Sequence, residues 1–261
     1  MSKKYLLYID ILGFSDLVAR SPKKIPQLYK IIDELNVHKH DVFKTLVFSD
    51  TILVYNKAPA HTEHDHSYIV MYSIEFAQDL FYRLVGKNIF FRATLCFGEF
   101  NHSKLKNVDG FYGPALTDSY NDQKTIPGTG IFLHKSVWKR NDIFHVVNFS
   151  RDYRFAIINQ VLDSAWQDYR PHIPFPISPY DFEDLDLPWE IAEDVVFFRN
   201  VYKNMNNHPE PNVRTKFLTT WQLYRKRFGP ILDALEKSKF DPKVLVPDFD
   251  WNKAMKQAEK K

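Results

Sequence analysis

The sequence has very little cysteine and glycine, and it has no long apolar run. Its 261 residues include a single cysteine, Cys96, which excludes an intrachain disulfide framework and is typical of a reducing, cytoplasmic compartment. Glycine occurs only 8 times, so its presence inside a short motif is informative. No apolar stretch approaches the roughly 20 residues that a membrane-spanning helix needs. The short apolar segment near the N-terminus contains Asp10, so we expect neither a signal peptide nor a membrane partner.

The chain also lacks a strong charge of either sign. Lysine and arginine total 35 and aspartate and glutamate total 32, a formal charge of +3. The basic residues are spread along the chain, so we expect no nucleic-acid partner. The hydrophobic content of 44% is enough for one substantial domain with an extension.

Two strongly apolar stretches each contain a single aspartate. Residues 5–9 form an unbroken apolar run that predicts a strand buried on both faces, and Asp10 follows it directly. Residues 46–55 repeat the pattern around Asp50. An unpaired buried carboxylate is costly, so each needs a cation or strong donors, although either one alone could be an ordinary turn residue. Together they favour a two-carboxylate site for Mg²⁺ or Mn²⁺.

The residues after Asp10 suit a phosphate. Gly13 permits a tight turn close to a ligand. Ser15 or Asp16 is expected to cap a helix whose free N–H groups face the same place as Asp10. A carboxylate beside a helix N-terminus would hold a metal-bound phosphate.

Helical and strand patterns alternate over the first 137 residues and predict an α+β fold with a ferredoxin-like βαββαβ core. After the first strand we expect a helix over 17–39 broken at 21–26, and then a strand or a tight hairpin over 45–55 with Ser49–Asp50 at its bend. A helix over 67–85 capped by Gly86, a strand over 89–100, a helix over 113–124 and a strand over 130–133 follow.

The remaining residues predict extra strands and helices outside that core. We expect strands within 143–162, a proline-rich linker over 168–188, helices over 189–204 and 212–235, and a charged tail. This pattern predicts a core over residues 1–165 and a C-terminal extension over 166–261 packed on it.

A histidine-rich segment lies at residues 57–67, which we read as a loop. It holds His61, His64 and His66 around Asp65. A solvated loop is favoured over a zinc site, because no second group of ligands is evident.

Four segments, taken in order, resemble the motif series of class III nucleotidyl cyclases: YIDILGF, VFSDTILVY, FFRATLCFGEF and FYGPALTDSYN. The resemblance covers residues 4–137, with a weaker similarity at 213–228. Within that superfamily the chain looks most like the stand-alone pyrimidine cyclases of bacterial anti-phage (Pycsar) systems. This resemblance implies conversion of UTP, or CTP, to the 3′,5′-cyclic monophosphate and pyrophosphate, as a second messenger for a separate effector. UTP is slightly favoured, although no residue identifies the base.

The resemblance also implies roles for individual residues. Two divalent ions, Mg²⁺ or Mn²⁺, would be held by Asp10, Asp50 and the backbone carbonyl of Ile11. The β- and γ-phosphates would be bound by the turn that contains Gly13, Phe14 and Ser15. Arg92 would contact the terminal phosphates, and its alternative is an ordinary edge-strand arginine.

The fourth motif departs from the adenylyl cyclases. There a glycine is followed, four and eight residues later, by an asparagine and an arginine that act on the ribose and the transition state. Counting from Gly113, those positions hold Thr117 and Asn121. Asn121 has no charge, so the usual cation is missing, and Lys124 or Lys216 could replace it.

The base-selecting positions depart as well. Leu46 and Gly110 stand where adenylyl cyclases have lysine and aspartate and where guanylyl cyclases have glutamate and cysteine. Asp109 is one residue out of register. The absence of purine-reading groups disfavours ATP and GTP, and it is compatible with a pyrimidine near Phe48 or Tyr112.

In this superfamily the metal carboxylates and the fourth-motif residues of one site come from different subunits. The resemblance therefore implies a symmetric homodimer with shared active sites.

Two alternatives stay open: an adenylate cyclase with rearranged base contacts, and a catalytically weak module that binds nucleotide or a partner protein. The uncharged Asn121 favours the module, whereas Asp10, Asp50 and Arg92 favour the enzyme.

Overall fold

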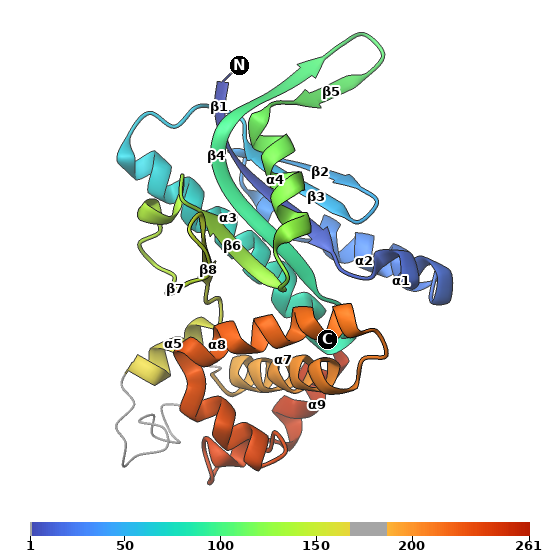
Figure 1. Cartoon of the computed structure of the whole chain (residues 1–261), viewed down its shortest axis with the longest axis vertical. Helices are drawn as coiled ribbons and strands as arrows, with labels where there is room; N and C mark the ends of the chain where they lie inside the picture. Colours follow the sequence, from blue (N-terminus) through green and yellow to red (C-terminus); the bar gives the residue numbers. More distant parts are fainter. Residues whose placement is uncertain (1, 168–186) are drawn as a thin grey trace. The chain divides into compact units, whose positions relative to one another are not determined.

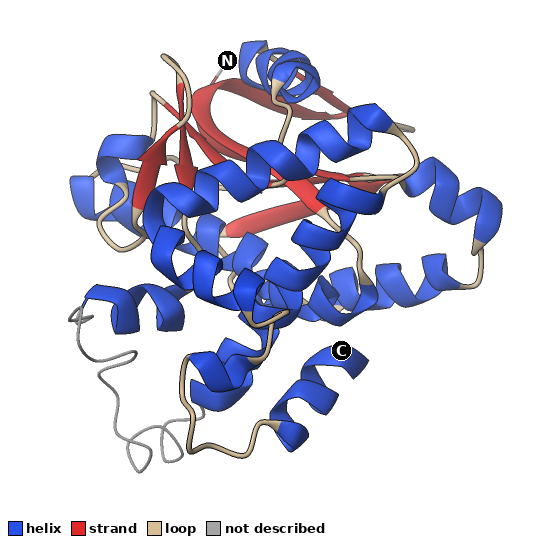
Figure 2. Cartoon of the chain, turned by 60° about the horizontal axis from the view of Figure 1, so that its bottom comes forward, coloured by secondary structure: helices blue, strands red, loops and turns tan. Residues whose placement is uncertain are grey.

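The computed structural model describes residues 2–167 and 187–261. Apart from its last two positions, the predicted linker over 168–188 lies outside these residues. The chain divides into two compact units: Met1–Phe81 with Phe90–Ala156, and Tyr82–Ile89 with Ile157–Lys261. The first unit is built on a sheet and the second is helical (Figures 1 and 2).

The first unit contains one mixed sheet in the order β2-β3-β1-β4-β6-β8-β7, with β5 paired to β4. Its strands are β1 Ser2–Ile11, β2 Phe43–Phe48, β3 Thr51–Asn56, β4 Phe91–Lys104, β5 Asp109–Tyr112, β6 Gly130–His134, β7 Val146–Asn148 and β8 Tyr153–Ala156.

The first four strands form the predicted ferredoxin-like core. Their order is β2-β3-β1-β4, and each neighbouring pair is antiparallel. Helices α1 (Phe14–Arg20) and α2 (Lys24–Asp33) connect β1 to β2, and α3 (Glu63–Leu84) connects β3 to β4. Helix α4 (Pro114–Thr125) then leads to β6, which lies parallel to β4. The α+β fold prediction is confirmed, including the additional strands.

Strand β1 is buried on both faces, as its unbroken apolar run predicts. Leu6 and Leu7 have no exposed surface. Leu6 packs in a cluster with Cys96 of β4 and Ala115 of α4. Tyr5 points to the other face and bonds His66 of α3. Helices α4 and α3 therefore cover opposite faces of the sheet (Figure 1).

Helix α3 begins at Glu63, four residues earlier than predicted. The backbone N–H groups of His61 and Thr62 donate to the Asp65 carboxylate, and the Asp65 N–H donates to Thr62 Oγ1. This arrangement closely resembles a capping box, which starts a helix by satisfying its free N–H groups. The loop prediction is thus wrong from Glu63 onward.

The predicted glycine cap of α3 is also wrong. After α3 a 3₁₀ turn covers Val85–Lys87, and the left-handed residue is Asn88, with φ 53°. Gly86 serves a different purpose: a Cβ there would lie 2.5 Å from the carbonyl oxygen of Ala258. Gly86 is needed because two backbone segments approach closely.

Among the described residues, no group of three or more histidine, cysteine or acidic side chains is arranged to hold a metal ion. The zinc alternative for His61, His64 and His66 therefore has no support in this part of the chain.

The second unit contains α5 (Gln160–Gln167), α7 (Leu187–Asn207), α8 (Pro211–Lys237) and α9 (Asn252–Lys260). The two helices predicted over 189–204 and 212–235 are confirmed. Helix α8 kinks at Phe228, two residues before Pro230, which lacks the N–H that would continue the helix. Across the described part of the chain, no helix is both long and apolar enough to span a lipid bilayer.

A buried carboxylate lies inside the second unit. Asp194 has no exposed surface, and its Oδ1 accepts hydrogen bonds from Asn159 and from the hydroxyl of Tyr82. Its Oδ2 is buried with no hydrogen-bond partner among the described residues. Burial disfavours the charged form and raises the pKa of Asp194 well above its ordinary value.

We expect Asp194→Asn to stabilise the protein more at pH 8 than at pH 5. The folded-state pKa lies above the unfolded one, so the wild type loses stability as pH rises, and asparagine removes that loss. Thermal unfolding measures the difference, and about 1 kcal/mol corresponds to about 2–4 °C in Tm. The exposed Asp248→Asn is the matched control. An equal effect of Asp194→Asn at both pH values would contradict the expectation.

Candidate functional site

The β2–β3 hairpin brings Asp50 next to Asp10. Asp10 pairs with Thr51 across β1 and β3, and the Ile11 N–H donates to the carbonyl of Asp50 over 2.9 Å. The two carboxylates thus occupy neighbouring backbone positions at one end of the sheet, although 40 residues separate them in the sequence. Ser49 adopts a left-handed conformation, with φ 55°, which closes the hairpin and leaves Asp50 partly exposed.

Asp10 is held by a buried arginine. The Nη2 of Arg92 lies 3.2 Å from Oδ2 of Asp10, and Arg92 is only 8% exposed. Its Nη1 donates to the carbonyl of Ile126 over 2.6 Å, and its Nε donates to Gln123 Oε1 over 3.1 Å. Burial lowers the pKa of Arg92, and the negative charge of Asp10 opposes that effect. Every guanidinium nitrogen therefore has a protein partner, so Arg92 is an interior residue that positions Asp10. Its predicted contact with terminal phosphates stays a prediction.

Gln123 joins this arginine to α4. Its side chain is 3% exposed, and its Nε2 donates to the backbone carbonyls of Tyr8, over 2.8 Å, and of Arg92, over 3.2 Å. One amide group thus connects α4 to β1 and β4 beside Asp10. The role of Gln123 could not be predicted from the sequence, because nothing there distinguishes one buried polar position on a mostly polar helix from a solvated one.

The turn after Asp10 starts α1 without a side-chain cap. Gly13 is the N-cap residue, with φ 68°, and Ser15 and Asp16 lie inside the first turn, so the capping expected from them is wrong. Of the three predicted phosphate-binding residues, Gly13 and Ser15 are exposed. The ring of Phe14 is buried and lies 6.4 Å from that of Tyr29. Only the backbone of Phe14 is thus available to a ligand.

The predicted catalytic residues lie on an exposed part of α4. Thr117 Oγ1 donates to the carbonyl of Gly113 over 3.3 Å, and Asn121 follows one turn later. Lys124 lies over the ring of Tyr120, 3.8 Å from its centre. Among the contacts of the described residues, none joins Thr117 or Asn121 to the carboxylates. The other proposed cation, Lys216, belongs to the second unit.

The predicted base-binding residues lie on β2 and β5. Phe48 ends β2 and is 83% exposed, and Leu46, two residues earlier, packs against the cluster that contains Leu6. Tyr112 ends β5, is half exposed, and accepts a hydrogen bond from Asn101 over 2.8 Å. Gly110 pairs with Ser103 across β4 and β5. These positions offer a ligand mainly apolar and aromatic surface.

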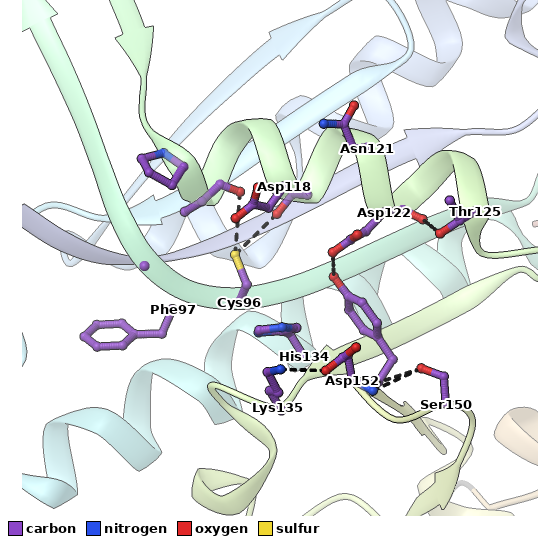
Figure 3. A pocket seen from close by; sticks show the side chains of 15 residues that line it. Cys96, Phe97, Asp118, Asn121, Asp122, Thr125, His134, Lys135, Ser150 and Asp152 are labelled. Carbon is purple, nitrogen blue, oxygen red and sulfur yellow. Dashed lines mark hydrogen bonds and ion pairs between the residues drawn. The ribbon is translucent and has the colours of Figure 1, made fainter.

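A pocket of about 440 Å³ lies beside α4, with Asn121 among the residues that line it (Figure 3). The hydroxyl of Tyr153 donates to Asp122 over 2.6 Å, and Lys135 pairs with Asp152. Cys96 also lines it, and burial raises the pKa of its thiol to about 11, so the thiol stays protonated. With its lysine paired to one of its carboxylates, this pocket does not suit a triphosphate.

The pair formed by Asp10 and Asp50 suits a hard divalent cation. Both supply carboxylate oxygens, and both are partly exposed, so a hydrated ion and a phosphate can reach them. Gly13 adds a turn without a side chain next to them. This donor set fits Mg²⁺ or Mn²⁺ rather than zinc, which favours nitrogen and sulfur ligands.

We expect Gln123→Leu to lower the free energy of unfolding by about 1–3 kcal/mol, because it leaves buried partners in Arg92 and Tyr8 unsatisfied. The exposed Asn121→Ala on the same helix is the control and should change it by less than about 0.5 kcal/mol. Urea denaturation measures both. Equal effects would mean that the Gln123 amide makes no special contribution.

Comparisons with known proteins concern the fold. No protein-family model matches the chain, and no curated protein matches it significantly in sequence. Similar solved structures include the guanylyl cyclase Cya2, with 14% identity and a TM-score of 0.42 over 59% of this chain and 91% of that one. The adenylyl cyclase CyaB from P. aeruginosa has 11% identity and a TM-score of 0.43 over 59% and 93%. The dimeric guanylyl cyclase domain of the RhoGC fusion protein from Blastocladiella emersonii has 13% identity and a TM-score of 0.46 over 60% and 96%.

Proposed function

We propose that the chain is a metal-dependent pyrimidine nucleotide cyclase. It would convert UTP, or CTP, to the 3′,5′-cyclic monophosphate and pyrophosphate, and its product would serve as a second messenger in anti-phage defence. The observation that carries the proposal is that Asp10 and Asp50 occupy neighbouring backbone positions beside the Gly13 turn. Two acids from separate apolar stretches meet at one end of a sheet, where their partly exposed oxygens are available to a divalent cation.

In this reaction the ribose 3′-oxygen forms a bond to the α-phosphorus, the bond to pyrophosphate breaks, and the 3′-hydroxyl loses its proton. Two divalent ions, when bound, stabilise the attacking and leaving oxygens. Asp10, Asp50 and the carbonyl of Ile11 would hold those ions. The backbone of the turn at Gly13 would orient the β- and γ-phosphates.

Arg92 would contribute through Asp10 in this proposal. Its 3.2 Å ion pair fixes one oxygen of that carboxylate before any ligand arrives. Gln123 and the carbonyl of Ile126 hold the guanidinium in place. A preorganised carboxylate need not be reoriented during the reaction, which favours the transition state.

The base would lie against the apolar positions at Leu46, Phe48 and Tyr112. The structure exposes Phe48 and Tyr112, and Leu46 offers no hydrogen bond to a purine. Thr117 and Asn121 are exposed, and none of the contacts of the described residues joins them to Asp10 or Asp50. This placement supports a homodimer in which they act on a nucleotide held by the partner subunit.

A second candidate is a module that binds nucleotide without turning it over. The specific observation in its favour is Asn121, which places an uncharged amide where a transition-state cation is expected. Such a module would keep its metal affinity and lose only the chemical step.

The decisive experiment is incubation of the purified protein with each of the four NTPs and Mn²⁺, with products identified by mass spectrometry. We expect one cyclic pyrimidine monophosphate. Asp10→Asn and Asp50→Asn should each reduce its rate by at least about a thousandfold, because metal stabilisation supplies several kcal/mol. Asp16→Asn on α1 is the matched control and should stay active. A cyclic purine product would refute the base assignment, and no product from any NTP would favour the binding module.

The shared site has its own test. Asp50→Asn chains and Thr117→Ala/Asn121→Ala chains should each be inactive alone. Mixed, they should recover about a quarter to a half of the wild-type rate, because heterodimers contain one intact site. Failure to recover activity, with heterodimers verified by native mass spectrometry, would show that each chain builds its site alone.

A further inference from the structure

A second pocket lies at the other end of β1 from Asp10. It measures about 500 Å³, and four of the residues that line it are lysines. They come from the four strands of the core or directly adjoin them: Lys4, Lys44, Lys57 and Lys104.

The strand register places two of these lysines on one face of the sheet. Lys4 is two residues before Leu6, so both point to the same side of β1. Leu6 pairs with Tyr55 of β3, and Tyr55 pairs with Lys44 of β2. Directly paired residues share a face, so Lys4 and Lys44 point the same way.

The other two lysines follow the same alternation. Lys57 is two residues after Tyr55. Lys104 is eight residues after Cys96, which pairs with Leu6. Lys57 directly follows the end of β3, and it lines the same pocket as the three lysines on this face. Asp10, six residues after Lys4, lies on this face at the opposite end.

The positive charge of this pocket is largely uncompensated. Within the described parts of the chain, no carboxylate lies at ion-pair distance from Lys44, Lys57 or Lys104. The Lys4 ammonium donates to the carbonyl of Lys57, which is neutral. The carboxylate that borders the pocket is Asp109, which pairs with His102 Nε2 at 3.2 Å.

Two further polar side chains line the pocket beside the lysines. The hydroxyl of Tyr55 and Nδ1 of His102 are joined by a 2.7 Å hydrogen bond, and both residues line the pocket. Tyr55 lies in β3 and His102 lies in β4, so the sheet fixes the positions of both residues. Lysine is a common phosphate ligand because its ammonium group is a compact point charge.

We propose that this lysine pocket binds a ligand with two or more linked phosphate groups, of the kind found in nucleoside triphosphates. Four lysines against one bordering carboxylate match the charge of such a group, and about 500 Å³ falls in the usual range of small-molecule sites. The pocket is distinct from the carboxylate site of its own chain. Six residues of β1 separate Lys4 from Asp10, which is about 20 Å along a strand, more than one triphosphate spans.

Two sources of this phosphate group are distinguishable. It belongs either to the substrate held on Asp10 and Asp50 of a second copy packed on this face, or to a separate nucleotide that regulates the protein. The first source rests on the proposed function, whereas phosphate binding itself does not.

The test is calorimetric titration of the wild type with inorganic tripolyphosphate in EDTA, which removes any contribution from a metal site. We expect binding that Lys44→Gln/Lys104→Gln weakens at least about tenfold, because two ammonium contacts are lost. Glutamine keeps most of the side-chain stem, and substitutions at exposed positions leave the unfolding free energy within about 0.5 kcal/mol. The control is Lys23→Gln/Lys24→Gln, which removes the same charge from exposed positions at the start of α2.

The control should bind as tightly as the wild type. The proposal would be overturned if the wild type did not bind tripolyphosphate, or if the Lys44/Lys104 variant bound it with unchanged affinity. It would also be overturned if the control lost as much affinity as that variant, because binding would then depend only on diffuse surface charge. Measurements of nucleotide turnover distinguish the two sources of the bound phosphate group. A raised KM for the nucleotide in the Lys44/Lys104 variant assigns the phosphate to substrate, and an unchanged KM with lost tripolyphosphate binding assigns it to a regulator. If no NTP is turned over, the proposed function fails and the titration still decides the pocket.

Discussion

The ion pair between Arg92 and Asp10 determines how the rest of the first unit is arranged. A buried charge is destabilising unless its partners are complete, and removal of one partner from such a pair costs several kcal/mol. Asp10, Gln123 and the carbonyl of Ile126 together complete the partners of the guanidinium. These partners come from β1, from α4 and from the residue that follows α4. The requirement to satisfy one arginine therefore fixes the helix above the sheet and the carboxylate at its end.

The sequence was most informative where hydrophobicity decides the structure. The apolar run of β1, the hairpin around Asp50 and the alternation of helices and strands predict the ferredoxin-like core, because burial depends on local patterns. The same pattern also predicts that Asp10 and Asp50 lie close together. The early start of α3 was missed because its cause is a side-chain cap involving Thr62 and Asp65, which a hydrophobic pattern does not show.

The polar features that were missed share a different cause. Gln123 and the lysine pocket are assembled from residues on separate strands and helices, so they exist only once the register is known. With the register in hand, one face of the sheet shows a division of charge. Asp10 lies at one end, α4 covers the middle, and Lys4 and Lys44 lie at the other end. The proposed metal ions and the proposed phosphate ligand would therefore bind at opposite ends of this face.

The lone cysteine makes the first unit observable in solution. Cys96 is 7% exposed, its thiol contacts Ser119, and its raised pKa keeps it protonated at neutral pH. Thiol reagents react with the thiolate, so the protonated and nearly buried Cys96 should react slowly while α4 stays packed on β4 and faster when α4 separates from it. The rate at which Cys96 is alkylated therefore reports how often that helix opens, and it can be measured in the natural sequence without introducing another cysteine.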